Sequence, residues 1–225
     1  MGRAVFTLVT LGIILALSLY SQLFELMPNN ERLRDILGVA CIWWAVALLW
    51  VRSYPASAVL WRPAWARLLM GLLVLVPTWF ALMALRLHSN GVGLIFVLIA
   101  LVTAADIGAY FTGKAWGKAK LAPNVSPGKS WAGFWGGLVT SALLALSLWW
   151  LLDGGQHSGL AVMAIAVATS LASVLGDLLE SMVKREQGVK DSGRILPGHG
   201  GMLDRLDSMT AAAPVFALCL LLAGW

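Results

Sequence analysis

Seven apolar stretches, most of them about as long as a bilayer is thick, constrain this chain more than any other feature. They cover roughly residues 4–24, 36–51, 66–87, 92–111, 132–152, 159–179 and 209–225. A helix needs about 20 mainly apolar residues to cross the hydrocarbon core of a membrane. Only 12% of the residues are charged and 60% are hydrophobic, so there is too little polar surface to cover a globule in water. The sequence predicts an all-α fold, a polytopic transmembrane helical bundle of about seven spans.

The basic residues indicate how this bundle is oriented. If seven spans alternate, thirteen of the 16 Lys and Arg residues fall on one side, and Arg32, Arg34 and Arg86 fall on the other. Cytoplasmic loops collect Lys and Arg, so the N-terminus and two polar loops, 112–131 and 181–207, are predicted to be cytoplasmic. The net charge of +5 therefore reflects topology, and no nucleic-acid partner is expected.

The chain divides into N-terminal transmembrane segments, 1–65, and a catalytic transmembrane domain, 66–225, which carries both loops. The first apolar stretch is long for the core of a cleaved signal peptide, so it is interpreted as a retained helix. Cys41 and Cys219 lie in apolar runs, and their surroundings predict neither a disulfide framework nor a zinc site.

The polar stretch 181–207 has the composition of a phosphate-binding site. Four acids, five bases, one histidine and five glycines fall within 27 residues. Arg can grip phosphate oxygens in a bidentate manner and Lys acts as a point charge. The glycines of 197–201 would let backbone N–H groups approach a phosphate beside the start of the last helix. A merely solvated charged loop is the alternative, but it leaves the glycine pattern unexplained.

Acidic residues flank this stretch on both sides. Asp177 closes an apolar helix, and Asp204 and Asp207 open the final one. Polar residues at spacings of three and four place one helical face along Ser173, Asp177, Glu180, Ser181 and Lys184. Acids at membrane depth need a partner, and convergent carboxylates suit a divalent cation such as Mg²⁺. The alternative is that each acid is simply paired with a cation such as Lys184 or Arg205.

The earlier loop repeats this theme in a smaller form. Ser126, Lys129 and Ser130 surround a Pro-Gly turn just before the fifth apolar stretch. They suit a second phosphate contact, although a simple turn with a serine N-cap explains the same residues. Asp106, in the fourth stretch, is either an ion-pair partner for a loop cation or part of the site.

The polar stretch closely resembles the diagnostic pattern of the phosphatidate cytidylyltransferase, or CDP-diacylglycerol synthase, family. The matching residues are Ser181, Lys184, Arg185, Lys190, Asp191, Gly193, Leu196, Pro197, His199, Gly200, Gly201, Asp204, Arg205 and Asp207. The resemblance extends through 176–180, 126–130 and 105–110, covers roughly 66–225, and is closest to the bacterial enzymes. Family members usually carry more N-terminal membrane segments than are found here.

The resemblance implies that CTP and phosphatidic acid give CDP-diacylglycerol and pyrophosphate in phospholipid biosynthesis. It implies Mg²⁺, with K⁺ as a second ion, a homodimer, and a location in the bacterial cytoplasmic (inner) membrane with the site facing the cytoplasm. The expected catalytic residues are Asp177, Lys184, His199, Asp204, Arg205 and Asp207. The expected substrate-binding residues are Ser126, Lys129, Ser130, Ser181, Arg185, Lys190, Asp191, Gly200 and Gly201. The expected metal ligands are Asp177, Glu180, Asp204 and Asp207, with Asp106 as a further candidate.

The residues themselves suit this reaction. A phosphate monoester has a second pKa of about 6, so the acceptor is already largely dianionic and needs no strong general base. The difficulty is to bring two polyanions together, for which metal ions, Lys and Arg are suited.

Two other functions remain open from the residues alone. A CTP-dependent polyprenol or phytol kinase would use the same groups but would transfer the γ-phosphate to an alcohol. An ion-coupled transporter would use Asp106 and Asp177 as an ion relay, but it would not need so dense a polar loop.

Overall fold

The computed structural model describes residues 2–25, 29–152, 157–195, 197–198 and 200–225. In this part of the chain seven long helices form the bundle: α1 (Gly2–Ser21), α2 (Asn30–Arg52), α4 (Ala64–Leu87), α5 (Gly91–Trp116), α6 (Trp131–Leu152), α7 (Gly159–Glu186) and α8 (Leu203–Ala223). All seven are long and apolar enough to cross a membrane. The predicted helical fold and number of spans are confirmed.

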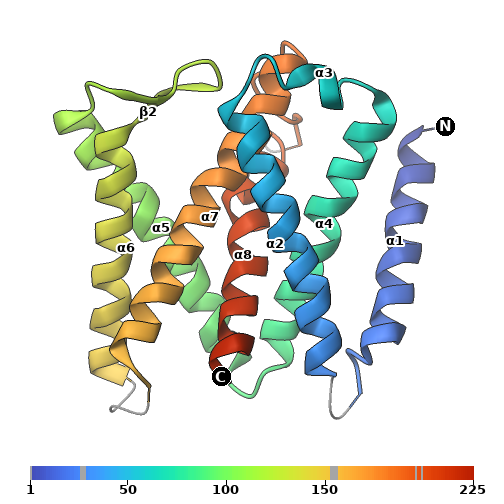
Figure 1. Cartoon of the computed structure of the whole chain (residues 1–225), viewed down its shortest axis with the longest axis vertical. Coiled ribbons are helices and arrows are strands. Elements are labelled where there is room, and N and C mark those ends of the chain that lie inside the picture. Colours follow the sequence, from blue (N-terminus) through green and yellow to red (C-terminus); the bar gives the residue numbers. More distant parts are fainter. Residues whose placement is uncertain (1, 26–28, 153–156, 196, 199) are drawn as a thin grey trace.

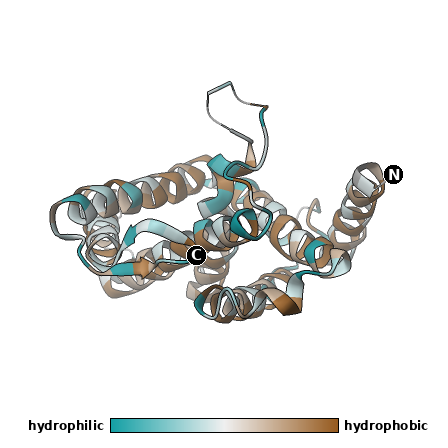
Figure 2. Ribbon diagram, turned by 90° about the horizontal axis from the view of Figure 1, so that it is seen from above, coloured by the Kyte–Doolittle hydropathy of each residue, from teal (hydrophilic) through white to brown (hydrophobic). Residues whose placement is uncertain are grey.

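The connections alternate between the two ends of the bundle. The N-terminus, the short helix α3 (Ala58–Trp61) and the strands β1 (Lys120–Ala122) and β2 (Ser126–Ser130) lie at one end, and the C-terminus lies at the other (Figure 1). Hydrophobic residues dominate the helices, and hydrophilic residues gather mainly at helix ends and connections (Figure 2). The two polar segments singled out in the sequence therefore share one end of the molecule, called the polar end below.

At the polar end, helices α5, α7 and α8 extend well beyond their apolar stretches. α5 continues to Trp116, α7 continues to Glu186, and α8 already begins at Leu203. Hydropathy marks where a helix is apolar and not where it ends, and Lys, Arg and Glu are good helix formers. The acids at the ends of α7 and α8 thus stand on regular helix.

A small antiparallel hairpin joins α5 to α6, which the sequence did not predict. Lys120 pairs with Ser130 and Ala122 pairs with Ser126. The hairpin is anchored by Val125, which is 1% exposed and belongs to a hydrophobic cluster with residues of α2 and α7. It therefore holds β2 against the polar end of the bundle.

Close contact between α7 and α8 depends on Gly176. A Cβ atom at this position would collide with the carbonyl oxygen of Asp207. The absence of a side chain lets the two backbones approach, as small residues do between membrane helices. This contact sets the polar last turns of α7 beside the first turn of α8.

Candidate active site

Lys184 links the end of α7 to the start of α8. Its Nζ lies 2.7 Å from Asp204 Oδ1 and 3.4 Å from Glu180 Oε1. The three side chains are 14%, 10% and 9% exposed, respectively. Ion pairs this enclosed are costly to break, because the remaining charge stays buried without a partner.

Asp204 also organises the segment that precedes it. Its two carboxylate oxygens accept hydrogen bonds from the Ser192 N–H at 3.0 and 2.9 Å, the Ser192 hydroxyl at 2.9 Å and the Gly201 N–H at 2.7 Å. Gly200, with a φ of +83°, makes the turn, and a Cβ there would lie 2.8 Å from Asp204 Oδ2. With the Lys184 bond, these donors occupy nearly all the lone pairs of one carboxylate. Asp204 thereby holds the glycine-rich segment in place.

Asp177 makes an ion pair with the hairpin at the polar end. Its Oδ2 lies 2.6 Å from Lys129 Nζ of β2, and its Oδ1 accepts a hydrogen bond from the Ser181 hydroxyl at 3.1 Å. The Asp177 and Lys129 side chains are 30% and 26% exposed. Lys129 is thus brought to α7 from about 50 residues away in the chain.

The predicted single polar face of α7 divides into two directions. Asp177 and Ser181 face the hairpin, whereas Glu180 and Lys184 face α8. Glu180 and Asp207 together line a separate cavity of about 180 Å³ that Arg67 also borders. The polar side of α7 therefore directs Asp177 toward the hairpin and Glu180 toward the cavity beside α8.

Ser130 has a structural role that the sequence left open. Its hydroxyl accepts a hydrogen bond of 3.2 Å from the Gly133 N–H, and the residue is 4% exposed. This is the geometry of an N-cap. Ser126 lies in β2 and is partly exposed. Of these three hairpin residues, Lys129 is the one that contacts an acid of α7.

The last turn of α7 is braced from two sides. Arg185, expected to bind substrate, donates from Nε to the Val125 carbonyl at 3.3 Å. Glu186 accepts from Arg62 Nε at 2.7 Å and from the Tyr54 hydroxyl at 3.3 Å. Burial and the neighbouring Glu186 carboxylate raise the pKa of Tyr54. These contacts tie the hairpin and the α2–α4 connection to the turn that carries Lys184.

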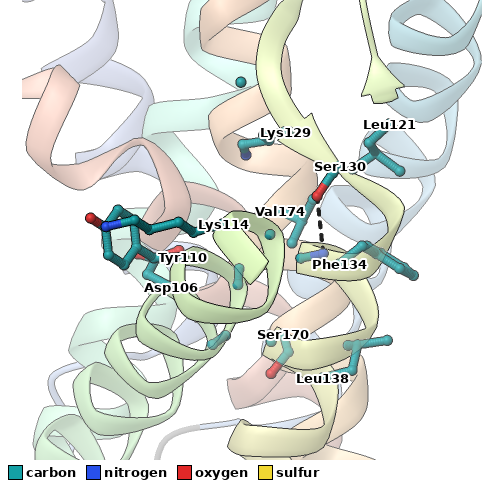
Figure 3. Close-up of a pocket in the computed structure, with 16 residues that line it drawn as sticks. Asp106, Tyr110, Lys114, Leu121, Lys129, Ser130, Phe134, Leu138, Ser170 and Val174 are labelled. Atoms are coloured by element: carbon teal, nitrogen blue, oxygen red, sulfur yellow. Dashed lines mark hydrogen bonds between the residues drawn. The ribbon is translucent and has the colours of Figure 1, made fainter. Parts of the chain in front are cut away.

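A cavity of about 390 Å³ lies between α5, α6, α7 and the hairpin. Asp106, Tyr110, Lys114 and Lys129 line it, together with apolar residues such as Leu138. Figure 3 shows Lys129 at one end, and Leu138 and Ser170 at the other. We call it the charged-mouth cavity. It has the dimensions and mixed lining of a ligand pocket, and it places Asp106 near Lys129, Asp177 and Asp207, whose charges act on it.

The acids offer a fit for a cation, although in the part of the chain described no three of them are grouped as a ready metal cluster. Both carboxylate oxygens of Glu180 are buried, and Oε1 lies 3.4 Å from the Lys184 ammonium. The charge of Asp207 acts on Glu180 from nearby. Two neighbouring carboxylates repel each other, and a hard cation would relieve this repulsion. Glu180 and Asp207 fit a metal ion better than Asp204, whose oxygens are already engaged.

The remaining predicted residues are spread around the glycine-rich segment. Lys190, Asp191 and Arg205 are exposed. Asp191 packs against Gly200, since a Cβ atom added to Gly200 would lie 3.3 Å from the Cβ atom of Asp191. His199 lies outside the described residues. Ser192 was missed by the sequence reasoning, although it follows Asp191 directly in the matching pattern.

Comparisons with known proteins agree with this arrangement. A model of the cytidylyltransferase family matches residues 2–223. A phosphatidate cytidylyltransferase from Pseudomonas aeruginosa is 51% identical over 190 residues, covering 84% of this chain and 70% of the relative. One from Haemophilus influenzae is 44% identical over 220 residues, covering 92% and 76%. Because the family match spans almost the whole chain, including both segments of the polar end, this protein belongs to the cytidylyltransferase family.

Proposed function

We propose that this protein is a phosphatidate cytidylyltransferase, which converts CTP and phosphatidic acid to CDP-diacylglycerol and pyrophosphate. The observation that carries the proposal is the pair of lysine–acid contacts, Lys129–Asp177 and Lys184–Asp204, at the polar end of a membrane bundle. Lys129 of the first pair also lines a cavity with charged groups at one end and apolar groups at the other. Relatives named for this activity match most of the chain.

In the reaction, an oxygen of the lipid phosphate attacks the α-phosphorus of CTP. A new P–O bond forms, the bond to the oxygen that bridges the α- and β-phosphates breaks, and pyrophosphate leaves. The lipid phosphate is already ionised, so no proton has to be removed first. Lys129 and Lys184 reduce the repulsion between the two anions, as fixed cations do in phosphoryl transfer.

The two substrates would approach the polar end from different directions. The lipid head group would lie near Lys129 and Lys114, with its chains extending toward Leu138 and Val174 in the charged-mouth cavity. The CTP phosphates would lie at the glycine-rich segment held by Asp204, where the start of α8 adds partial positive charge. We place this end in the cytoplasm, because it carries most of the Lys and Arg residues.

Mg²⁺ is the proposed cofactor, with Glu180 and Asp207 as its ligands, and K⁺ is proposed as a second ion near Asp177, which faces the neighbouring space. When bound, the metal would polarise the phosphates and stabilise the departing pyrophosphate. A homodimer remains a prediction from the resemblance, and measuring the mass of the detergent-solubilised protein would check it.

Chelation of divalent cations is expected to abolish turnover, and added Mg²⁺ is expected to restore it. Glu180→Gln should raise the Mg²⁺ concentration for half-maximal activity by on the order of tenfold or more, because a ligand is lost. Titrating Mg²⁺ into the purified wild-type and Glu180→Gln proteins measures both effects. An unchanged Mg²⁺ requirement in Glu180→Gln would remove this residue from the metal site.

The position of a radioactive label in CTP separates the proposed activity from its nearest alternative. Purified protein given phosphatidic acid and CTP labelled at the α-phosphate is expected to form labelled lipid, while CTP labelled at the γ-phosphate is expected to release labelled pyrophosphate only. A lipid kinase would give the reverse when the assay is repeated with phytol or a polyprenol as acceptor, with label in the lipid only from the γ-position. That result would overturn the proposal.

A further inference from the structure

A second cavity continues the line of the charged-mouth cavity toward the other end of the bundle. It has a volume of about 330 Å³ and lies between α5, α6, α7 and α8. The two cavities use the same helix faces, since their lining residues recur at spacings of three or four. On α7 these are Val162 and Ala166 for the second cavity, followed by Ser170 and Val174 for the charged-mouth cavity. Both cavities therefore lie along one interface between α5, α6 and α7, called the seam below.

The two cavities are separated where α6 and α7 meet. Ser141 of α6 and Ser170 of α7 share a hydrogen bond of 2.7 Å between their hydroxyl groups. The two residues are 0% and 1% exposed. Ser170 lines the charged-mouth cavity, whereas Ala166, one turn away, lines the second cavity. The serine pair thus forms a floor at the apolar end of the charged-mouth cavity.

This floor lies at a depth that a lipid chain would reach. Ser170 precedes Asp177 by seven residues, and a helix rises about 1.5 Å per residue, so the floor is roughly 10 Å from the acid. One leaflet of the hydrocarbon core is about 15 Å deep, half of the full thickness. A fully extended chain of ordinary length, starting near Lys129, would therefore meet the serine pair before it ends.

The surroundings of the serine pair favour an apolar occupant. Its hydroxyl groups are engaged with each other, and Ser170 also contacts the Ala166 carbonyl at 2.9 Å. Leu138 lies at this end of the cavity as well (Figure 3). No polar group is left free there for a polar ligand among the residues named. Only the mouth, with Lys129 and Lys114, is suited to a phosphate.

We propose that the Ser141–Ser170 pair limits how far an acyl chain of the lipid substrate enters the bundle, and so determines chain-length selectivity. This inference rests on the proposed function, because it assigns the lipid to the charged-mouth cavity. The pair acts by its shape: it closes the seam with two small residues held together, and the second cavity beyond it stays out of reach.

The test compares kcat/KM for dioctanoyl, dilauroyl and dioleoyl phosphatidic acid. Ser170→Leu raises the floor, so kcat/KM for the dioleoyl substrate should fall about tenfold relative to the dioctanoyl substrate, the scale of a small steric difference in an apolar pocket. Ser170→Thr adds one methyl group and keeps the hydroxyl, so it should shift the ratio in the same direction by a smaller factor. It also serves as the second variant if Ser170→Leu does not fold.

Two further variants act as controls. Ala164→Leu adds the same bulk to an exposed position of α7 and should leave the ratio unchanged. Ala166→Leu fills the second cavity below the floor and should also leave it unchanged. An effect of Ala166→Leu equal to that of Ser170→Leu would show that chains pass the serine pair, and would overturn the inference. An unchanged ratio in both Ser170 variants would overturn it as well.

Failure of the proposed function would look different. In that case wild-type protein would form no CDP-lipid from any of the three substrates. If wild-type protein converts all three and only the chain-length ratio fails to respond to Ser170, the activity stands and the assignment of the floor is wrong.

Discussion

Replacing Asp204 with Asn is expected to lower kcat by about a hundred- to a thousandfold, the scale found when one preorganised polar contact is lost from an active site. Asn presents an amide NH₂ where the carboxylate accepted hydrogen bonds from Ser192 and Gly201. It also leaves the Lys184 ammonium, 14% exposed, without its closest counter-charge. Both effects loosen the glycine-rich segment at the same time, so the loss should exceed that from any exposed residue of the same loop.

The measurement is turnover of purified variants at saturating CTP and lipid. Asp35→Asn is the matched control, because it makes the same chemical change at an exposed position of α2 and should keep wild-type turnover. Elution as a single peak and an unchanged helical circular dichroism spectrum would show that Asp204→Asn inserts and folds. Near-normal turnover in a folded Asp204→Asn protein would contradict the role given to this carboxylate.

Lys129→Ala is expected to lower kcat/KM for phosphatidic acid by roughly ten- to a hundredfold, the scale of a hydrogen bond to a charged group. Lys129 is the cation that the hairpin brings to α7, and its ion pair with Asp177 at 2.6 Å fixes it beside the charged-mouth cavity. Lys118→Ala removes an exposed lysine just before the same hairpin and should have little effect. Initial rates over a range of lipid concentrations measure the change.

A double-mutant cycle with Asp177→Asn then separates two roles of the pair. If Lys129 and Asp177 serve only to hold the hairpin against α7, the double variant should lose no more than the worse single variant. If each also contacts substrate or metal, as proposed, the double variant should lose more than either single variant. The first outcome would restrict the pair to positioning.

The number and order of the membrane helices follow directly from the apolar stretches. Each stretch predicted at the outset corresponds to a helix, because a bilayer accepts only segments that satisfy their own backbone hydrogen bonds. That 126–130 and 181–207 form one substrate site stays a prediction, although Lys129 of the first segment does contact Asp177, just before the second. Local composition was sufficient to predict the helices, because it determines whether a segment is more stable in lipid or in water.

Pairing between side chains was not predictable in the same way. The sequence placed four acids in one metal group, whereas in the structure Lys184 joins Asp204 and Lys129 joins Asp177. A spacing of three or four puts residues on one side of a helix, but the width of that side allows them to face different neighbours. Which neighbour each acid meets depends on how α7 lies against α8 and the hairpin.

The seven apolar stretches determined the bundle and the end at which its polar segments meet. The tertiary structure decided what those segments do to one another. The close approach at Gly176, the anchoring of Val125 and the contact of Ser141 with Ser170 all join residues that are distant in sequence. Such contacts depend on the relative positions of whole helices, which are set by the packing of many side chains together and not by the pattern along any one of them.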